Sequence, residues 1–105
     1  MTRFAFRLYV AGQTERSLAA EANLRTLCES FLPGEYDLEV IDAVEQPGRA
    51  EEQRILATPA VLRLAPSPQR RVIGDLSDHR RAAQALGLPA GDNGVDGVPP
   101  GDLDD

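Results

Sequence analysis

The hydrophobic pattern of the first 42 residues predicts a strand, a helix and a second strand. Apolar residues share one face over residues 4–10, and the other face is also mostly apolar, which favours a central strand. Apolar residues recur at helical spacing over residues 20–31, which predicts a helix. Thr14 or Ser17 can cap its start, and Pro33-Gly34 ends it. Alternation returns over residues 36–42. This order predicts a parallel βαβ unit with a right-handed crossover.

The second half of the chain predicts two short helices and two short strands. Pro47 can open a helix that ends near Ala57, because Thr58-Pro59 breaks it. Residues 60–65 and 70–73 form strands on either side of a proline-containing loop. A last helix, capped by Asp75 or Ser77, runs through Leu86. The order β-α-β-α-β-β-α is that of a thioredoxin-like α/β fold with a mixed four-stranded sheet.

The 105 residues fit one domain, predicted over residues 1–88, followed by a Gly/Pro/Asp-rich tail over residues 89–105. The tail has too few apolar side chains to offset the entropy of ordering it, so we expect it to be disordered. The net charge is −6, and five of the seventeen acidic residues lie in this tail. The rest of the chain is nearly neutral. Since nucleic-acid binding needs a basic face and a high pI, no nucleic-acid partner is expected.

No pattern of residues in the chain indicates a catalytic or metal site. A redox thioredoxin needs C-x-x-C at the start of its first helix, whereas this chain has Gly12-Gln13-Thr14-Glu15 there. Cys28 lies on the apolar stripe, which indicates a core residue. His79 has no clustered ligands for a metal, and the adjacent Glu51 and Glu52 point about 100° apart on a helix. We therefore expect no enzyme activity, no metal and no cofactor.

No apolar run is long enough to span a bilayer, and the N-terminus has no apolar stretch typical of a signal peptide. We therefore expect a cytoplasmic protein without a membrane partner. The lone cysteine agrees with that location. Arg70 and Arg71 side chains face opposite sides of the predicted strand. Their charges fit either ordinary surface residues or contacts to a partner.

Five short strings occur in order over residues 8–78, and together they resemble the KaiB family over about three-quarters of the chain. They read Leu8-Tyr9-Val10-Ala11-Gly12, Val40-Ile41-Asp42, Ala50-Glu51-Glu52, Ile55-Leu56-Ala57-Thr58-Pro59 and Arg70-Arg71-Val72-Ile73-Gly74-Asp75-Leu76-Ser77-Asp78. The resemblance implies a clock regulatory protein without enzymatic activity. Its implied partner is a KaiC-type ATPase, whose phosphorylation and ATPase cycle it modulates.

The resemblance also implies site residues. The expected contacts to the ATPase are Arg54, Arg63, Arg70, Arg71 and Asp75. The family is known for two folds, a tetrameric ground state and a thioredoxin-like binding state, and proline isomers take part in the switch. The prolines expected to matter are Pro59, Pro66 and Pro68. Thioredoxin-like folds usually hold a cis-proline where Pro59 lies, so we expect a cis bond there rather than a plain turn.

Several positions depart from the family pattern. Ala19 and Glu45 stand where many members carry an Arg and a KaiA-contacting Lys, so capture of KaiA is doubtful. Residues 80–89 are rich in helix formers and lack β-branched residues, although the ground-state fold needs a strand there. We therefore expect a monomer in the thioredoxin-like state, with a tetramer possible in the other fold.

Two other functions remain open. One is a KaiB-like sensor module linked to histidine-kinase signalling, although no kinase segment follows in the sequence given. The other is a redox-inactive thioredoxin-like domain that binds proteins.

Overall fold

The computed structural model describes residues 3–89, and the predicted tail lies outside these residues apart from Pro89. Seven elements follow in the predicted order. They are β1 (Phe4–Val10), α1 (Glu15–Phe31), β2 (Tyr36–Asp42), α2 (Pro47–Glu52), β3 (Ala60–Ala65), β4 (Arg70–Ile73) and α3 (His79–Leu86). The β-α-β-α-β-β-α prediction is confirmed.

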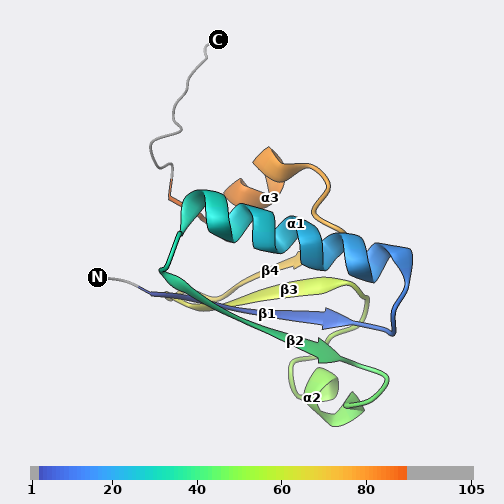
Figure 1. Cartoon of the computed structure of the whole chain (residues 1–105). Helices are drawn as coiled ribbons and strands as arrows, with labels where there is room; N and C mark the ends of the chain where they lie inside the picture. Colours follow the sequence, from blue (N-terminus) through green and yellow to red (C-terminus); the bar gives the residue numbers. More distant parts are fainter. Residues whose placement is uncertain (1–2, 90–105) are drawn as a thin grey trace.

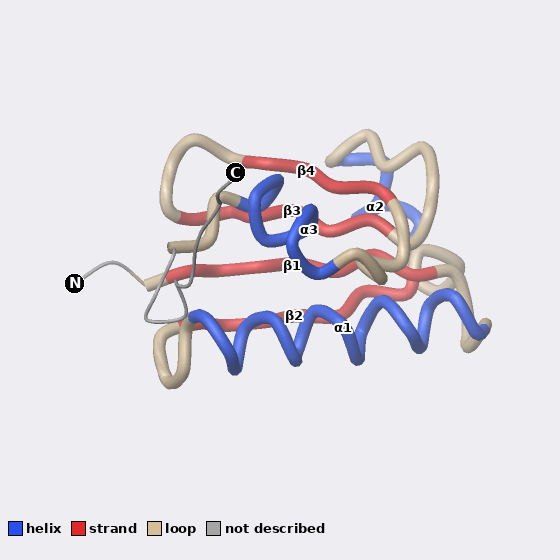
Figure 2. Tube along the Cα trace, turned by 90° about the horizontal axis from the view of Figure 1, so that it is seen from above, coloured by secondary structure: helices blue, strands red, loops and turns tan. Residues whose placement is uncertain are grey.

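The four strands form one mixed sheet in the order β2-β1-β3-β4. β1 pairs parallel with β2 and antiparallel with β3, and β3 pairs antiparallel with β4 (Figure 2). The central place predicted for β1 follows from its two apolar faces: Leu8 and Tyr9 are both fully buried on opposite faces. β2 lies at an edge, which leaves Val40 exposed although the alternation placed it on the apolar face.

The helices form layers on both faces of the sheet. α1 and α3 cover one face, and the short α2 covers part of the other (Figure 1). The larger core lies under α1 and α3 and contains Leu8, Leu24 and Leu86, all fully buried. A smaller core around Tyr9 and Ile41 lies on the α2 side. No helix within residues 3–89 is long and apolar enough to cross a membrane.

α1 begins as its sequence predicts. The side chain of Thr14 accepts a hydrogen bond from the Ser17 amide at 3.1 Å, so Thr14 is the cap rather than Ser17. The helix ends at Phe31, and Gly34 follows with a left-handed φ of 73°. Three residues of the predicted stripe, Ala20, Leu24 and Leu27, are buried against the sheet.

α2 ends five residues before the predicted Ala57. After Glu52 the chain turns: Arg54 adopts a left-handed φ of 54°, and the Ile55 amide donates to the Ala50 carbonyl at 3.0 Å. This turn carries Ile55 back onto the smaller core. Burial of that side chain therefore outweighs the local helix propensity of residues 53–57.

α3 begins at His79, later than the capping candidates suggested. Asp78 is the cap, because its carboxylate accepts from the Arg81 amide at 3.1 Å. The predicted caps Asp75 and Ser77 instead pair with each other in the preceding loop. The bond before Pro59 is cis, as predicted, and the bonds before Pro66 and Pro68 are cis as well.

Candidate partner-binding surface

The pairing of β3 with β4 divides the expected contact residues between the two faces of the sheet. Arg63 lies opposite Arg70 in the register, whereas Arg71 lies opposite Leu62. Side chains alternate along a strand, so Arg63 and Arg70 share the face covered by α3, and Arg71 lies on the α2 face. Asp75 follows β4 in the loop before α3. The five residues therefore form three separate groups rather than one cluster.

Arg63 is not a surface residue. It is 4% exposed, and its guanidinium lies over the Phe4 ring, 5.7 Å from the centroid. Its Nη1 donates to the Leu86 carbonyl at 2.9 Å, and its Nη2 donates to the Pro68 carbonyl at 2.7 Å. The expectation that Arg63 contacts a partner is therefore corrected. Its positive charge lies at the negative end of α3, where it ties that helix to the β3–β4 loop.

Arg70 is the exposed member of this pair. A Cβ built on Gly87 would lie 2.9 Å from the Arg70 Nε and 2.8 Å from the Arg63 Nη1, so both guanidinium groups rest against this glycine. Burial lowers the pKa of Arg63, and the neighbouring charge of Arg70 lowers it further. Within residues 3–89, Arg70 takes part in no ion pair.

Arg71 and Arg54 form the second group, beside α2. The Arg71 guanidinium donates to the Gln53 carbonyl at 2.7 Å and to the Arg54 carbonyl at 3.0 Å. It thus closes the turn after α2 across the sheet edge. The side chains of Arg54 and Arg71 remain exposed, and Leu56 nearby in the chain is 94% exposed. This group combines positive charge with an apolar side chain.

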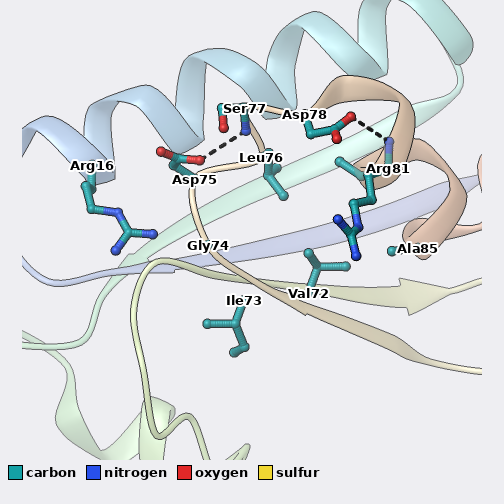
Figure 3. Close-up of a pocket in the computed structure, with 11 residues that line it drawn as sticks. Arg16, Val72, Ile73, Gly74, Asp75, Leu76, Ser77, Asp78, Arg81 and Ala85 are labelled. Carbon is teal, nitrogen blue, oxygen red and sulfur yellow. Dashed lines mark hydrogen bonds between the residues drawn. The ribbon is translucent and has the colours of Figure 1, made fainter.

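Asp75 lines a shallow hollow of about 290 Å³ between α1, β4 and α3 (Figure 3). Its carboxylate accepts from the Ser77 amide at 3.1 Å, and its carbonyl accepts from the Asn23 side chain at 2.8 Å. Hydrogen bonds with Ser77 hold the pKa of Asp75 below its ordinary value, and the charge of Arg16 lowers it further. Asp75 is thus ionised and fixed in position.

Arg16 and Arg81, which were not predicted as site residues, line the same hollow from α1 and α3 (Figure 3). Asn23 also bridges α1 to this loop, because its side chain meets Asp75 and the His79 ring. These residues come together only through packing of α1 beside α3. No local sequence signal pointed to them.

The place of a thioredoxin redox centre holds no sulfur. A hollow of about 520 Å³ lies where the start of α1 meets the Thr58-Pro59 bond, lined by Thr14, Glu15 and Ser17 among others. Cys28 is fully buried elsewhere on α1, as predicted, and burial raises its pKa to about 12. A thiol in that state does not act as a nucleophile at neutral pH.

The other polar side chains considered as candidates lie at the surface. His79 is exposed, as predicted, and its Nε2 lies 3.0 Å from the Asn23 Oδ1. Glu51 and Glu52 are exposed on α2. Within the described residues, no group of three or more His, Cys, Asp or Glu side chains could hold a metal ion.

The opposite edge of the sheet, β2, carries acidic side chains. Asp37 pairs with Arg3 at 2.8 Å, and Glu39 pairs with Arg49 at 2.8 Å and Arg7 at 3.2 Å. The Arg3 guanidinium holds the pKa of Asp37 below its ordinary value, and Arg49 does the same for Glu39. The exposed carboxylates of the β2 edge are therefore paired with arginines, whereas Arg70 on the β4 edge has no ion pair within residues 3–89.

Two solved structures illustrate which proteins share this backbone arrangement. The N-terminal domain of Synechococcus elongatus SasA has a TM-score of 0.67 and 22% identity, with 83% of this chain and 86% of that domain covered. Mitochondrial thioredoxin 3 from Saccharomyces cerevisiae has a TM-score of 0.65 and 15% identity, with 84% and 81% covered. These likenesses confirm the thioredoxin-like fold.

Comparison of sequences identifies the family, whereas the structural likenesses identify only the fold. Circadian clock oscillator protein KaiB of Synechococcus sp. RCC307 is 47% identical over 85 residues, which cover 81% of this chain and 77% of that protein. Circadian clock protein KaiB3 of Synechocystis sp. PCC 6803 is 40% identical over 88 residues, covering 84% and 86%. Residues 7–88 match the KaiB domain. With this match and these identities, the chain belongs to the KaiB family.

Proposed function

We propose that this chain is a circadian clock regulatory protein that binds a KaiC-type ATPase and modulates its phosphorylation and ATPase cycle. The observation that carries the proposal is the KaiB domain match, which takes in nearly all of the seven elements. Relatives of similar length bear the names of clock oscillator proteins. A protein of this kind acts by binding one state of the ATPase more tightly than another, which shifts the population toward that state.

The exposed arginines are the proposed contacts. Arg70 and Arg71 lie on the edge strand β4, and Arg54 lies in the turn that Arg71 closes. Guanidinium groups bind carboxylates in a planar two-point geometry, so an acidic surface of the ATPase fits Arg70 and Arg54. Arg71 adds its positive charge while its Nη atoms hold the turn after α2. Asp75, fixed and ionised, offers an acceptor for a donor on the same partner. Arg63 supports this surface from below.

The remaining parts of the proposal concern partners and location. Glu45 is exposed in the turn after β2, and its negative charge disfavours a KaiA-type partner that meets a Lys there. We propose a KaiA-independent, cytoplasmic and monomeric protein without catalytic activity. A helix over residues 79–86 supports the monomeric thioredoxin-like state, because the alternative fold needs a strand in this region.

Binding to the KaiC homologue of the same genome, with ATP or ADP, tests the proposal. We expect Arg70→Ala and Arg71→Ala together to weaken binding about tenfold or more, equivalent to roughly 1.4 kcal/mol. Arg25→Ala is the matched control, since Arg25 is exposed on α1 and already pairs with Glu21. Circular dichroism checks that all variants are folded. Equal affinity of the double variant and the control would contradict the proposed contact surface.

A redox-inactive protein-binding domain would give a different result, because it does not predict binding to a KaiC-type ring that depends on the bound nucleotide. Absence of any such binding by the wild-type chain would therefore favour that alternative over the clock function.

A further inference from the structure

Two guanidinium groups lie at the C-terminal end of α3 without a carboxylate partner among residues 3–89. Arg63 is buried and its Nε has no hydrogen-bond partner. Arg70 lies beside it on the open edge of the sheet. The carbonyls of Leu86 and Pro68 accept hydrogen bonds from Nη1 and Nη2 of Arg63 but leave its Nε–H without an acceptor. Two like charges against one glycine create a positive potential that attracts anions.

The chain itself supplies acidic groups at this place. The described residues end at Pro89, two positions after Gly87, against which both guanidinium groups rest. Beyond Pro89 the sequence contains no basic residue and five aspartates. They are Asp92, Asp96, Asp102, Asp104 and Asp105. Because a fully extended chain spans at most about 3.3–3.6 Å per residue, three residues of chain reach no more than roughly 11 Å from the Cα of Pro89.

We propose that the acidic segment of residues 91–105 docks on the surface formed by Arg70 and the end of α3, above the buried Arg63, with the carboxylates of Asp92 and Asp96 meeting Arg70. The attachment point lies next to the arginine pair, so the effective concentration of these carboxylates is on the order of millimolar or higher. A single exposed ion pair is weak. Because the segment is attached beside the arginines, the high effective concentration of its carboxylates allows the docked state to form in a substantial fraction of the molecules. The contact does not depend on the identity of any external partner.

A paramagnetic label in the segment measures the contact in the full chain. Val98→Cys places a nitroxide two residues beyond Asp96, and the buried Cys28 remains unlabelled because its thiol is inaccessible. At about 20 mM salt we expect strong relaxation enhancement at the amides of Arg70 and Gly87. The amides of Asp37 and Glu39, on the opposite edge strand, serve as internal controls.

Charge dependence separates docking from mere proximity of a tethered segment. We expect Arg70→Gln, Asp92→Asn with Asp96→Asn, or about 0.5 M salt each to reduce the enhancement at Gly87 at least twofold. Asp102→Asn with Asp104→Asn removes the same charge farther along the chain and is expected to act less. Arg25→Gln, on α1, is expected to change nothing.

Two results would overturn the proposal. Enhancement that is unchanged by Arg70→Gln and by salt would mean that the segment is near the arginines only because it is attached there. The second result comes from a mixture in which one chain carries the nitroxide without ¹⁵N and the other carries ¹⁵N without the nitroxide. Enhancement in that mixture would mean that the segment contacts a second copy of the chain. The backbone amide spectrum of each variant verifies that the domain is folded.

Discussion

At the scale of single residues, Arg63 shows how a charge can be placed in a core. Its stem and guanidinium lie over Phe4, and its donors meet backbone carbonyls at the end of α3 and in the β3–β4 loop. The sequence did not reveal this role, since an arginine on an edge-proximal strand is usually exposed. Only the meeting of three distant segments creates the carbonyl site.

Gly87 is the residue that makes room for this arrangement. It has a left-handed φ of 67°, and a Cβ there would lie within 2.9 Å of both guanidinium groups. Gly34 has a similar φ of 73° but open space around it, so it is a matched control. We expect Gly34→Ala to cost about 1 kcal/mol from backbone strain alone. Gly87→Ala should cost about 1 kcal/mol more, because the Arg63 guanidinium must shift.

Urea unfolding of the two variants measures this difference. Equal destabilisation by Gly34→Ala and Gly87→Ala would show that both guanidinium groups move aside freely, contrary to the close packing described for Arg63.

Glu39 offers a test of the acidic edge. Arg49 and Arg7 lower its pKa, so the ionised carboxylate stabilises the fold above its unfolded-state pKa, and this contribution is lost as the pH falls through the folded-state value. We expect Arg49→Gln to raise the pKa of Glu39. Asp37 is the control on the same strand, because Arg3 rather than Arg49 lowers its pKa.

Carboxyl carbon NMR titration follows both groups at once. The pair is absent in solution if the Glu39 titration is the same in wild type and Arg49→Gln. A shift of Asp37 as large as that of Glu39 would instead indicate a general change of the edge.

At the scale of elements, predictability follows the source of the stabilisation. β1, α1 and β2 were predictable because alternation, helical spacing, the Thr14 cap and Pro33-Gly34 all act locally. The end of α2 was not, because burial of Ile55 against a distant core decides it. The start of α3 was misplaced because three residues that can cap a helix, Asp75, Ser77 and Asp78, occur within four positions, and packing selects among them.

The cap of α3 is open to a direct test. Asp78→Ala removes the acceptor for the Arg81 amide and should cost about 1 kcal/mol, whereas Asp78→Asn should retain most of the stability. Asp75→Ala is the comparison, since Asp75 lies outside the helix. Chemical denaturation of the three variants decides the assignment. A larger loss for Asp75→Ala than for Asp78→Ala would restore Asp75 as the cap.

At the scale of the whole molecule, the fold is thioredoxin-like, and the place of the thioredoxin redox centre holds no sulfur. The start of α1 and the cis-proline segment still adjoin, but the polar side chains that line the hollow between them are hydroxyl groups, Glu15 and Arg16. The thiol of the chain lies in the main core instead. The fold class was therefore predictable from element order, and strand alternation predicted that Arg70 and Arg71 lie on opposite faces. The place of Arg63 beside Arg70 required the β3–β4 register.

Reactivity of Cys28 reports on the integrity of that core. Because the thiol is fully buried and its pKa is raised to about 12, we expect Ellman's reagent to react only when the domain opens. The native rate at pH 8 should be on the order of a hundredfold or more below the rate in 6 M guanidinium chloride. A native rate within a few fold of the unfolded rate would mean that α1 is not packed as described.

The cross-strand pair of Arg7 and Glu39 has a consequence for how the first two strands find their alignment. A slip of two residues keeps every side chain on its own face, so alternation alone does not prevent it. On the α2 face, however, the last step along each strand leads from a charged side chain to a fully buried apolar one: Arg7 to Tyr9 on β1, and Glu39 to Ile41 on β2. Any two-residue slip sets a charged side chain against the buried apolar part of its neighbour. In the native alignment the charged residues Arg7 and Glu39 lie opposite each other, and so do the buried residues Tyr9 and Ile41. The positions of these four side chains therefore specify the register of the two strands.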